Sequence, residues 1–393
     1  MARDGPPVYD GRLIAFGKGA AVLLKTPFNN YHRKNNAQLV DFAGWEMPLR
    51  FGSILEEHKQ VREHCGIFDV SHMGRVKFTG RHARRFLERI CTRRLSDMAE
   101  KTCRYSLVCN ETGGVRDDVI IYRFDDHWLM VCNASNREKL LAHFNAVKGD
   151  LAVNIDDQTV KTGMIALQGP DTMSLVTKFS KEIPTLKKYT FTIKNLLILK
   201  MIVSRTGYTG EDGIELILPA NVVDMALKLL LKTDENGEQL VKPIGLGARD
   251  TLRMEAGMPL YGHELTEELD PISAGLKWAV SLDKDTDEQW GPAEKFIGCD
   301  ALKKIAAEGP ARQLVGLKLA GKRTARQHMP VVKNGAKIGE VTSGCLSPTL
   351  GYPIAMAYLD AASAVIGNSV EVDLGKQSAP AEIVKPPFYK RAQ

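Results

Sequence analysis

The first two thirds of the chain alternates strand-like and helix-like hydrophobic patterns. Val76 and Phe78 alternate with polar neighbours in residues 75–80, which predicts a short strand. Over residues 81–94 the apolar residues instead recur at helical spacing and form one stripe, which predicts a helix. Further strands are predicted at residues 105–109, 119–124, 128–132, 196–204 and 214–218. Further helices are predicted after a capping box of Ser135 and Glu138, after a cap at Asp171, and over residues 222–231 and 249–256.

The last part of the chain is almost entirely strand-like. Residues 283–311 are charged and contain two Gly-Pro pairs, which suits a domain boundary. Within the segment 331–341, Asn334-Gly335 is a strong hairpin signal. The other predicted strands are residues 314–319, 354–359 and 370–374. This pattern predicts a small all-β barrel or sandwich.

Length and composition are those of an ordinary globular protein. The 393 residues suggest about two to three domains. Hydrophobic residues make up 44% and charged residues 25%, which excludes a disordered, collagenous or membrane-spanning chain. The N-terminal stretch is a poor secretory or transit signal and is interpreted as a short extension. The net charge of +6 favours an acidic protein or an anionic ligand and is too weak to indicate nucleic acid.

The seven cysteines form no CxxC pair. Neither a zinc site nor a disulfide framework is therefore indicated. Free, mostly buried thiols in a reducing compartment are expected. The bacterial cytoplasm is the expected location, with an organelle matrix as the alternative.

Four segments place polar, charged and glycine residues next to predicted strand ends. The sequence has no GxxxxGK[ST] loop and no GxGxxG after a strand, which argues against nucleotide triphosphate chemistry and a dinucleotide fold. Ser71-His72 lacks the GxSxG elbow of a hydrolase, and a lone histidine such as His72 is more often a packed residue than a catalyst. The four segments are residues 44–48 with 69–74, residues 110–118, residues 204–215, and residues 245–257 with 260–262.

Asp117 and Asp118 are adjacent on a predicted strand, so their side chains should point to opposite faces. The inward-facing carboxylate would be desolvated, which raises its pKa and suits it to proton transfer. The alternative is that both are solvated hairpin residues, and spacing alone favours it. The outward-facing aspartate should tolerate replacement by Asn.

Glu215 and Arg249 are the other candidates for ligand contacts. Glu215 stands between Ile214 and Leu216 on a predicted strand, and a buried carboxylate there needs hydrogen-bond donors. An amino-pyrimidine edge would supply them, and an internal arginine is the equal alternative. Arg249 opens a predicted helix, and from the sequence alone an ion pair with Asp250 or Glu255 is the favoured interpretation.

Six arginines decorate the predicted helix of residues 81–94. A solvated basic face is the default interpretation, and docking of an acidic protein is the functional alternative. The arginines are Arg81, Arg84, Arg85, Arg89, Arg93 and Arg94.

Seven ordered motifs make the chain resemble the glycine cleavage T-protein family, the aminomethyltransferases. They extend over roughly residues 25–390, and single motifs also occur in related folate-binding proteins. The motifs are FAGWEMP (42–48), FDVSHMG (68–74), GGVRDDVI (113–120), ALQGP (166–170), RTGYTGEDGIE (205–215), ARDTLRMEAGMPLYGHEL (248–265) and EVTSGCLSPTLG (340–351).

The resemblance implies an α+β fold with a three-lobed, cloverleaf-like arrangement. Two interleaved mixed α/β lobes form the folate-binding region and a β-barrel forms the third lobe. The expected divisions are an N-terminal extension at 1–24, the folate-binding region at 25–285, a linker at 286–311 and the barrel domain at 312–393.

The implied activity is transfer of a one-carbon unit from the aminomethylated lipoyl arm of H-protein to tetrahydrofolate. Ammonia and methylenetetrahydrofolate are the expected products. Tetrahydrofolate is the acceptor, with no metal and no nucleotide cofactor, and no nucleic acid or membrane partner is expected. The alternatives are a related tetrahydrofolate-dependent demethylase and a non-catalytic folate-binding relative.

The resemblance also assigns site residues. The catalytic aspartate of the family matches Asp118, which would orient and deprotonate the folate amine and stabilise nearby positive charge. The pterin-binding glutamate matches Glu215, and a ligand-contacting arginine matches Arg249. Tyr208 and Met73 match positions that line the folate channel, and Tyr389 loosely matches a substrate-contacting tyrosine near the C-terminus. Arg116 stands where the family has an aliphatic residue; it is expected to point outward, and if it pointed inward it would lower the pKa of Asp118.

Overall fold

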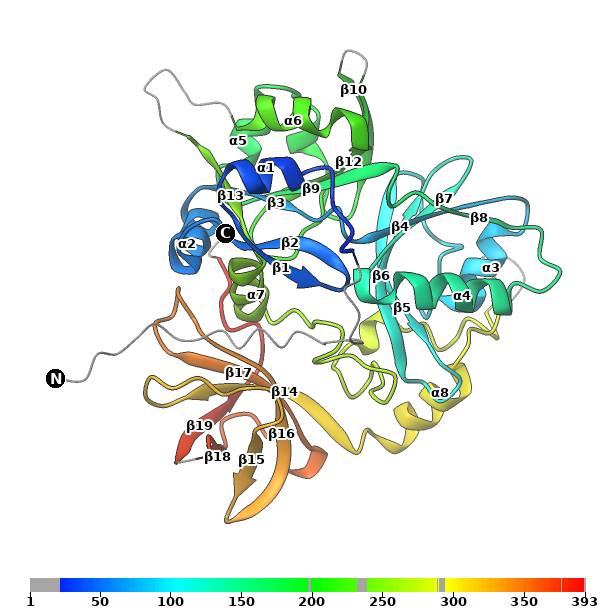
Figure 1. The fold of residues 1–393 in the computed structure, drawn as a ribbon. Helices are drawn as coiled ribbons and strands as arrows, with labels where there is room; N and C mark the ends of the chain where they lie inside the picture. The colour runs from blue at the N-terminus through cyan, green and yellow to red at the C-terminus, as the bar shows by residue number, and fades with distance from the viewer. Residues whose placement is uncertain are drawn as a thin grey trace.

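The chain forms two sheet-containing lobes and a C-terminal barrel (Figure 1). The computed structural model describes residues 22–391 except 197–198, 232–238, 288, 290–293 and 376. Most of the expected N-terminal extension, residues 1–21, lies outside these ranges. No helix in the described ranges is both long enough and apolar enough to cross a membrane.

One lobe is a five-stranded sheet covered on one face by two helices. Apolar residues that alternate along its strands pack against the apolar stripes of α3 (Ala83–Ile90) and α4 (Arg137–Val147). The ring of Phe78 lies 6.0 Å from that of Phe86 and 5.6 Å from that of Phe144, so strand and helices share one core. In spatial order the strands are β5 (Thr102–Cys109), β6 (Val115–Arg123), β7 (Trp128–Cys132), β4 (Gly74–Thr79) and β8 (Asn154–Asp157).

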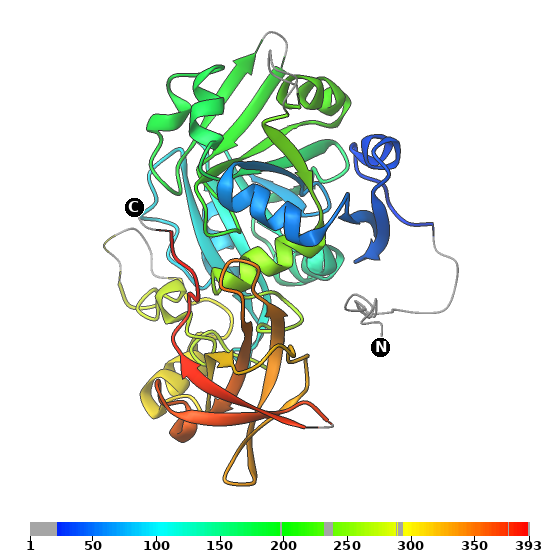
Figure 2. The ribbon, with the colours of Figure 1, turned by 90° about the vertical axis from the view of Figure 1, so that its left-hand side faces the viewer.

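The other lobe is a six-stranded sheet with helices on both faces (Figure 2). α5 (Thr172–Thr177) and α6 (Val223–Leu230) share a core with one face, and α2 (Ile54–Glu63) and α7 (Leu246–Glu255) with the other. Only β13 pairs in parallel, with β3. The strand order is β10 (Phe191–Leu196), β11 (Leu199–Ser204), β12 (Gly213–Pro219), β9 (Thr162–Gln168), β3 (Cys65–Asp69) and β13 (Val241–Ile244).

The inner faces of the two sheets meet in a shared core. Tyr122, Leu129 and Val131 of the five-stranded sheet pack with Phe68 and Ala166 of the six-stranded sheet. Ala248 and Leu252 of α7 complete this core. Polar side chains at the margins of these inner faces are therefore brought together from both lobes.

A small N-terminal unit packs beside the six-stranded sheet. It consists of α1 (Asn29–Lys34) and the hairpin of β1 (Gln38–Phe42) and β2 (Trp45–Arg50). Ala43 and Gly44 turn the hairpin with φ values of 52° and 80°, the combination that a tight two-residue hairpin turn requires. Leu24 adds to the edge of β2 through two backbone hydrogen bonds.

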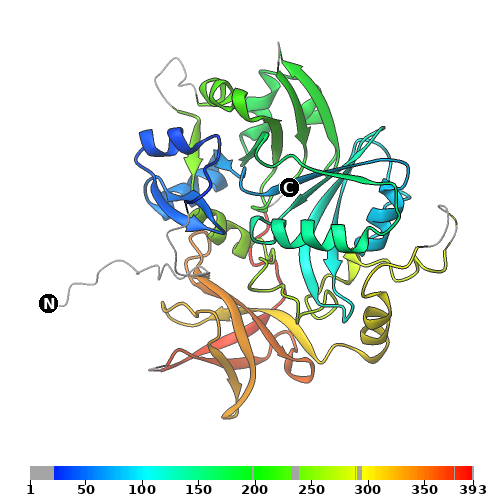
Figure 3. The same ribbon diagram turned by 45° about the vertical axis from the view of Figure 1, so that its right-hand side comes forward.

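The C-terminal lobe is a closed six-stranded barrel (Figure 3), which decides between the barrel and the sandwich. The predicted hairpin turn at Asn334-Gly335 is confirmed, with φ values of 52° and 79°. Helix α8 (Cys299–Glu308) lies in the stretch expected as a linker. In spatial order the strands are β14 (Arg312–Leu319), β17 (Pro353–Asp360), β16 (Ala336–Leu346), β15 (Pro330–Lys333), β18 (Ser369–Asp373) and β19 (Ser378–Val384).

The two predicted helix caps are wrong in their side-chain contacts. Ser135 lies within a 3-10 turn, and α4 begins one residue after Asn136 without a side-chain cap. The Asn136 amide instead donates to Asp117, 2.6 Å away. Asp171 does precede α5, but its carboxylate lies 3.2 Å from the His64 ring nitrogen rather than on the helix backbone.

All seven cysteines are buried, free thiols, as the sequence predicts. Burial raises the pKa of Cys65 to about 11 and that of Cys91 to about 12. These thiols are therefore neutral and behave as small apolar side chains.

Candidate active site

Four of the predicted site residues gather where the two sheets and α7 meet. Asp118 comes from β6, Glu215 from β12, Arg249 from α7, and Tyr208 from the loop between β11 and β12. All four are half-buried. The Arg249 guanidinium carbon lies 4.6 Å from the centre of the Tyr208 ring, and the charge of Asp118 helps to raise the pKa of Tyr208. The charges of Arg249 and Glu215 also influence each other, so one neighbourhood holds all four.

Asp117 and Asp118 point to opposite faces of β6, as the alternation predicts. Asp118 accepts a hydrogen bond of 3.3 Å from the hydroxyl of Tyr105 on the neighbouring strand, on the inner face of the sheet. Asp117 points to the helix-covered face, where it accepts from Asn136 at the start of α4. Neither aspartate is a solvated hairpin residue, so that alternative is wrong.

Asn133 joins the two carboxylates. Its side-chain amide lies 2.9 Å from Asp117 Oδ1 and 2.7 Å from Asp118 Oδ1, and its backbone N–H donates to Asp117 Oδ2 at 3.0 Å. Burial raises the pKa of both aspartates, and the charge of Asp118 raises that of Asp117 further. Asp117 is fully buried and accepts three hydrogen bonds, so its replacement by Asn is now expected to cost stability.

Arg116 turns away from Asp118. Its guanidinium lies 3.1 Å from Glu267 and 3.6 Å from Glu111. Those two carboxylates compensate its charge, and the pKa of Asp118 is governed by burial, Asn133 and Tyr105. The departure from the family pattern at Arg116 thus leaves the carboxylate of Asp118 with its raised pKa.

Glu215 has spare hydrogen-bonding capacity. One of its carboxylate oxygens accepts from the Thr206 hydroxyl, and among the described residues no donor is recorded for the other oxygen. Burial raises the pKa of Glu215, while Thr206 and the nearby charge of Arg249 lower it. An ion pair with an internal arginine, the alternative interpretation of Glu215, is not formed within the described ranges.

Arg249 likewise faces the site with its donors unused. The predicted ion pairs are wrong, because Asp250 pairs with Arg253 at 2.8 Å and Glu255 pairs with Arg62 at 2.8 Å. Among residues that the structure describes, none accepts a hydrogen bond from the Arg249 guanidinium, which instead stacks on Tyr208. A planar guanidinium in this state is ready to bind an anionic or carbonyl group of a ligand.

Met73 and His72 lie in the turn between β3 and β4. Met73 is half-buried and packs against the core shared by the two inner sheet faces. His72 is buried with its ring 5.4 Å from that of Phe42, which confirms the prediction of a packed histidine. Burial lowers the pKa of His72 to about 3, aided by the charges of Arg249 and Arg75, so its ring stays neutral.

Tyr389 contacts Arg62 and Glu255 rather than Tyr208 or Arg249. Its ring covers the Arg62 guanidinium at 4.3 Å, and its backbone N–H donates to the Glu255 carbonyl at 2.9 Å. The structure therefore joins Tyr389 to α2 and α7, whereas it joins Tyr208 and Arg249 to each other. The substrate contact assigned to Tyr389 stays a prediction.

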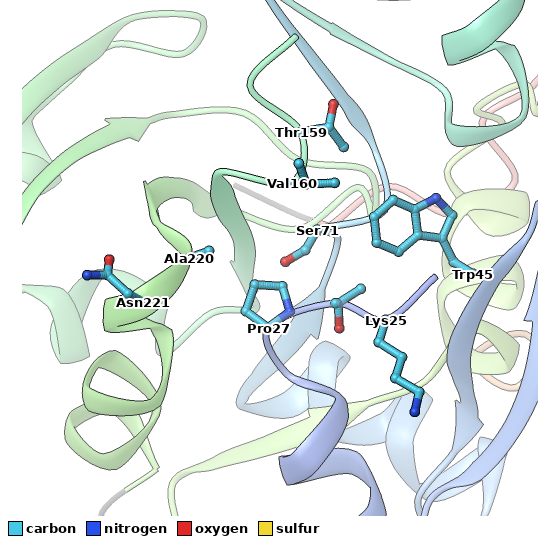
Figure 4. A pocket seen from close by; sticks show the side chains of 9 residues that line it. Lys25, Pro27, Trp45, Ser71, Thr159, Val160, Ala220 and Asn221 are labelled. Carbon is cyan, nitrogen blue, oxygen red and sulfur yellow. The ribbon is translucent and has the colours of Figure 1, made fainter. Parts of the chain in front are cut away.

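A separate surface pocket of about 340 Å³ lies beside the N-terminal unit (Figure 4). Trp45, Ser71 and Thr159 line it, and none of the predicted site residues does. Its hydroxyls are already engaged, because Ser71 bonds both backbone groups of Met164 and Thr159 bonds Asp157. In the part of the chain that the structure describes, no group of three or more His, Cys, Asp or Glu side chains is placed to hold a metal ion.

Sequence reasoning missed Asn133 and Tyr105, the two residues that hold Asp118. The signal for Asn133 was strand register, because a hairpin in which Arg123 opposes Trp128 places residue 133 opposite residue 118. Tyr105 lies on β5, where Leu107 opposes Asp118, and a register shift between Val108 and Cys109 means that this pairing cannot be counted from the turn at residues 110–114. Residue type alone did not reveal either one, because a polar side chain within a predicted strand or at its end looks the same as a surface position.

Two family models match the chain. The GCVT N-terminal domain matches residues 28–284, and the glycine cleavage T-protein C-terminal barrel domain matches residues 312–390. The first includes every candidate residue described above except Tyr389, and the second includes all six strands of the barrel.

Individual proteins are similar over nearly the whole chain. Proteins named aminomethyltransferase are 44% identical in Rubrobacter xylanophilus, over 96% of this chain and 97% of that protein, and 42% identical in Herpetosiphon aurantiacus, over 94% and 99%. A crystal structure of glycine cleavage system aminomethyltransferase T from Bartonella henselae superposes with a TM-score of 0.84 at 31% identity, covering 94% of this chain and 98% of that one.

Proposed function

We propose, for a chain that belongs to the glycine cleavage T-protein family and is an aminomethyltransferase, that tetrahydrofolate binds where the two sheets meet α7 and that Asp118 acts on its reacting amine. The family is folate-dependent, which supports a folate acceptor in the reaction. The observation that carries the proposal is Asp118 itself: a carboxylate on the inner face of β6, held by Asn133 and Tyr105, whose charge acts on Tyr208, the residue that stacks on Arg249.

The residues around this point fit a folate. Glu215 can accept from the adjacent N–H donors of an amino-pyrimidine edge, because one of its oxygens is already fixed by Thr206 and the other is not engaged by a described residue. Arg249 can donate to a carbonyl or carboxylate of the same ligand. Burial of both groups strengthens such bonds, because water competes less for them.

Tetrahydrofolate supplies the amine that accepts the one-carbon unit. Asp118 would accept a hydrogen bond from this amine, orient it and take its proton, since a carboxylate of raised pKa is a stronger base than an exposed one. The negative charge of Asp118 would also stabilise positive charge that develops on the transferred carbon. Asn133 and Tyr105 hold the carboxylate in one orientation, so no reorganisation is needed when the charge appears.

The test of this function is formation of methylenetetrahydrofolate from aminomethylated H-protein and tetrahydrofolate. Product that depends on both reactants supports the proposal. The demethylase alternative would form product from a small methylated compound without a protein carrier. A non-catalytic relative would bind folate and form none.

We further propose that the partner is the lipoylated H-protein and that it docks in part on α3. As a member of this family, the protein works with the other components of the glycine cleavage system. Four α3-region arginines are exposed and give this face a positive charge, which suits an acidic partner. They are Arg81, Arg84, Arg85 and Arg89.

Reversing Arg84 and Arg89 to Glu should slow association with H-protein about tenfold or more at low salt, because it removes electrostatic steering. Arg85 is left unchanged because it pairs with Glu294 at 2.9 Å. Stopped-flow association at several salt concentrations measures the rate, which should also become less dependent on salt. The matched control reverses the exposed barrel residues Lys322 and Arg323 and has the same total charge. Equal rates for the two double variants would place docking elsewhere.

Replacing Glu215 by Ala should weaken tetrahydrofolate binding by about 1.5–3 kcal/mol, the range for hydrogen bonds to a charged group. Titration calorimetry measures this affinity directly. Glu308, exposed at the end of α8, provides a control in which the same side chain is truncated. Unchanged affinity of the Glu215→Ala protein would reject Glu215 as the pterin contact.

The remaining parts of the proposal concern cofactors, location and domains. We propose no metal and no nucleotide cofactor, because a base and a negative charge suffice for amine attack on the one-carbon unit, and Asp118 supplies both. The bacterial cytoplasm is the proposed location, supported by bacterial relatives and by seven free thiols, which a reducing compartment maintains. The folate-binding region is proposed to occupy residues 25–285.

A further inference from the structure

The C-terminal tail leaves the barrel and runs back to the folate-site lobes. After β19 the chain leaves the barrel and runs up toward the sheets (Figures 1 and 2), where Tyr389 contacts α7 and Arg391 contacts α2. Tyr389 donates its backbone N–H to the Glu255 carbonyl and lays its ring on Arg62, 4.3 Å away. Arg391 donates from its guanidinium to the Glu211 carboxylate and to the Arg62 carbonyl. The tail thus contacts α2, α7 and the loop that carries Tyr208.

Arg62 is the centre of this contact. Its side chain is 6% exposed, and its guanidinium donates to Glu211 Oε1 at 2.9 Å and to the Thr209 carbonyl at 2.8 Å. On its other edge it donates to Glu255 Oε2 at 2.8 Å. A buried cation shared between two buried carboxylates holds both of them. Glu255 is also held by Ser347 and Thr349 of the loop after β16, whereas the carboxylate of Glu211 pairs only with arginines among the described residues.

The loop and the helix that Arg62 pairs with also carry Tyr208 and Arg249, the side chains proposed to contact the folate. Thr209 and Glu211 flank Gly210 in the loop that presents Tyr208, and Glu255 ends the helix that presents Arg249. Tyr208 and Arg249 stack on each other at 4.6 Å. The ionic contact at Arg62 therefore sets the relative position of the loop and the helix, and with it the geometry of the Tyr208–Arg249 pair.

The tail completes the charge balance of this contact. The Glu211 carboxylate is fully buried, and its two oxygens are divided between Arg62 and Arg391. Arg391 is 40% exposed, so it can be exchanged without opening a cavity. Its loss would leave one oxygen of Glu211 without its partner and free the loop on the side of Tyr208.

We propose that Arg391 is a positioning residue for the reaction, which acts through Glu211 and Arg62 to hold Tyr208 and Arg249 in place for the folate. This inference rests on the proposed function, because it assumes that folate binds against those two side chains. Tyr389 supports the same arrangement by covering Arg62 from the tail side.

The test compares Arg391→Gln with Lys390→Gln, which removes the same charge from the adjacent exposed residue. Arg391→Gln should raise the tetrahydrofolate Kd and KM about tenfold, with kcat at saturating folate within about twofold of the unchanged protein. Lys390→Gln should change neither, and Arg391→Lys, which keeps the charge, should recover most of the affinity. Thermal unfolding of Lys390→Gln and Arg391→Lys should match that of the unchanged protein, whereas Arg391→Gln should lose the stability that its hydrogen bond to the buried Glu211 contributes.

A second variant tests the route through Glu211. If Arg391 acts through Glu211, the double variant Glu211→Gln/Arg391→Gln should bind folate no more weakly than Glu211→Gln alone. Unchanged Kd in Arg391→Gln overturns the inference. A loss of thermal stability with unchanged KM also overturns it, since that marks a purely structural tie. Failure of the unchanged protein to bind tetrahydrofolate would instead overturn the proposed function.

Discussion

Replacing Asp118 by Asn is expected to lower turnover about 10²–10⁴-fold, the usual contribution of a general base. Asn has nearly the same shape and still bonds Tyr105 and Asn133 in part, so the protein should fold and bind tetrahydrofolate. It cannot take a proton or offset a developing cation. Steady-state turnover with aminomethylated H-protein, together with calorimetric folate affinity, separates these effects.

Two other aspartates of the same hairpin provide comparisons. Asp125 is exposed in the turn between β6 and β7, and Asp125→Asn should leave turnover unchanged. Asp117→Asn should cost about 1–3 kcal/mol of stability, because its amide would face the N–H donors of Asn133 and Asn136. Near-normal turnover of the Asp118 variant would remove it from the reaction. Loss of folate binding in that variant would make Asp118 a binding residue.

The pH dependence of turnover tests the same group. Burial raises the pKa of Asp118, so the carboxylate keeps its proton to a higher pH than an ordinary aspartate, whose pKa is about 3.9. Turnover requires the ionised form and should therefore rise with pH through this raised pKa. The acid limb of the kcat profile should lie clearly above pH 4. The residual activity of Asp118→Asn should lack that limb.

Replacing Glu264 by Ala is expected to lower the free energy of unfolding by about 3–5 kcal/mol, the cost of breaking a buried ion pair from one side. Glu264 is fully buried and bonds Arg253 at 2.9 Å and the Thr342 hydroxyl of β16 at 2.6 Å. Arg253 is 1% exposed and also reaches Ser343 of the barrel at 3.0 Å. The variant would leave a buried guanidinium undercompensated where α7 meets the barrel.

Urea unfolding measures this loss, and Glu268→Ala is the matched control. Glu268 lies in the same loop, is exposed, and has an unpaired side chain among the described residues. Its truncation should change the free energy of unfolding by less than about 0.5 kcal/mol. Equal stability of the two variants would show that the pair at Arg253 does not hold the barrel to α7.

The inward direction of Asp118 was predictable because it depends on a local rule. Successive side chains of a strand alternate between faces, and the apolar run from Val119 marks where the strand lies. The same rule placed Asp117 on the other face but could not show its surroundings. Asp117 is buried because α4 begins over it, and the position of α4 is set by packing of Leu140 and Phe144 against the sheet.

The partners of Arg249 were not predictable from neighbouring residues in the chain. Asp250 and Glu255 stand close to it in sequence, yet Asp250 bonds Arg253 one turn along the helix, and Glu255 bonds Arg62 of α2. Asp250 is 39% exposed and takes the arginine three residues along its own helix, whereas the fully enclosed Glu255 takes the cation that packing brings to it. The pairing followed from α2 and α7 lying side by side, which no local pattern contains.

The sequence by itself determined several of the strands and helices, the barrel hairpin at Asn334-Gly335 and the inward face of Asp118, because each depends on backbone preferences and periodicity within a few residues. Its ordered motifs also determined the family. Only the tertiary structure decided that Asn133 and Tyr105 hold Asp118, that Arg249 stays free for a ligand, and that the C-terminal tail reaches Arg62. These contacts join residues distant in the chain, and they form because burial leaves each polar group only the partners that packing brings within reach.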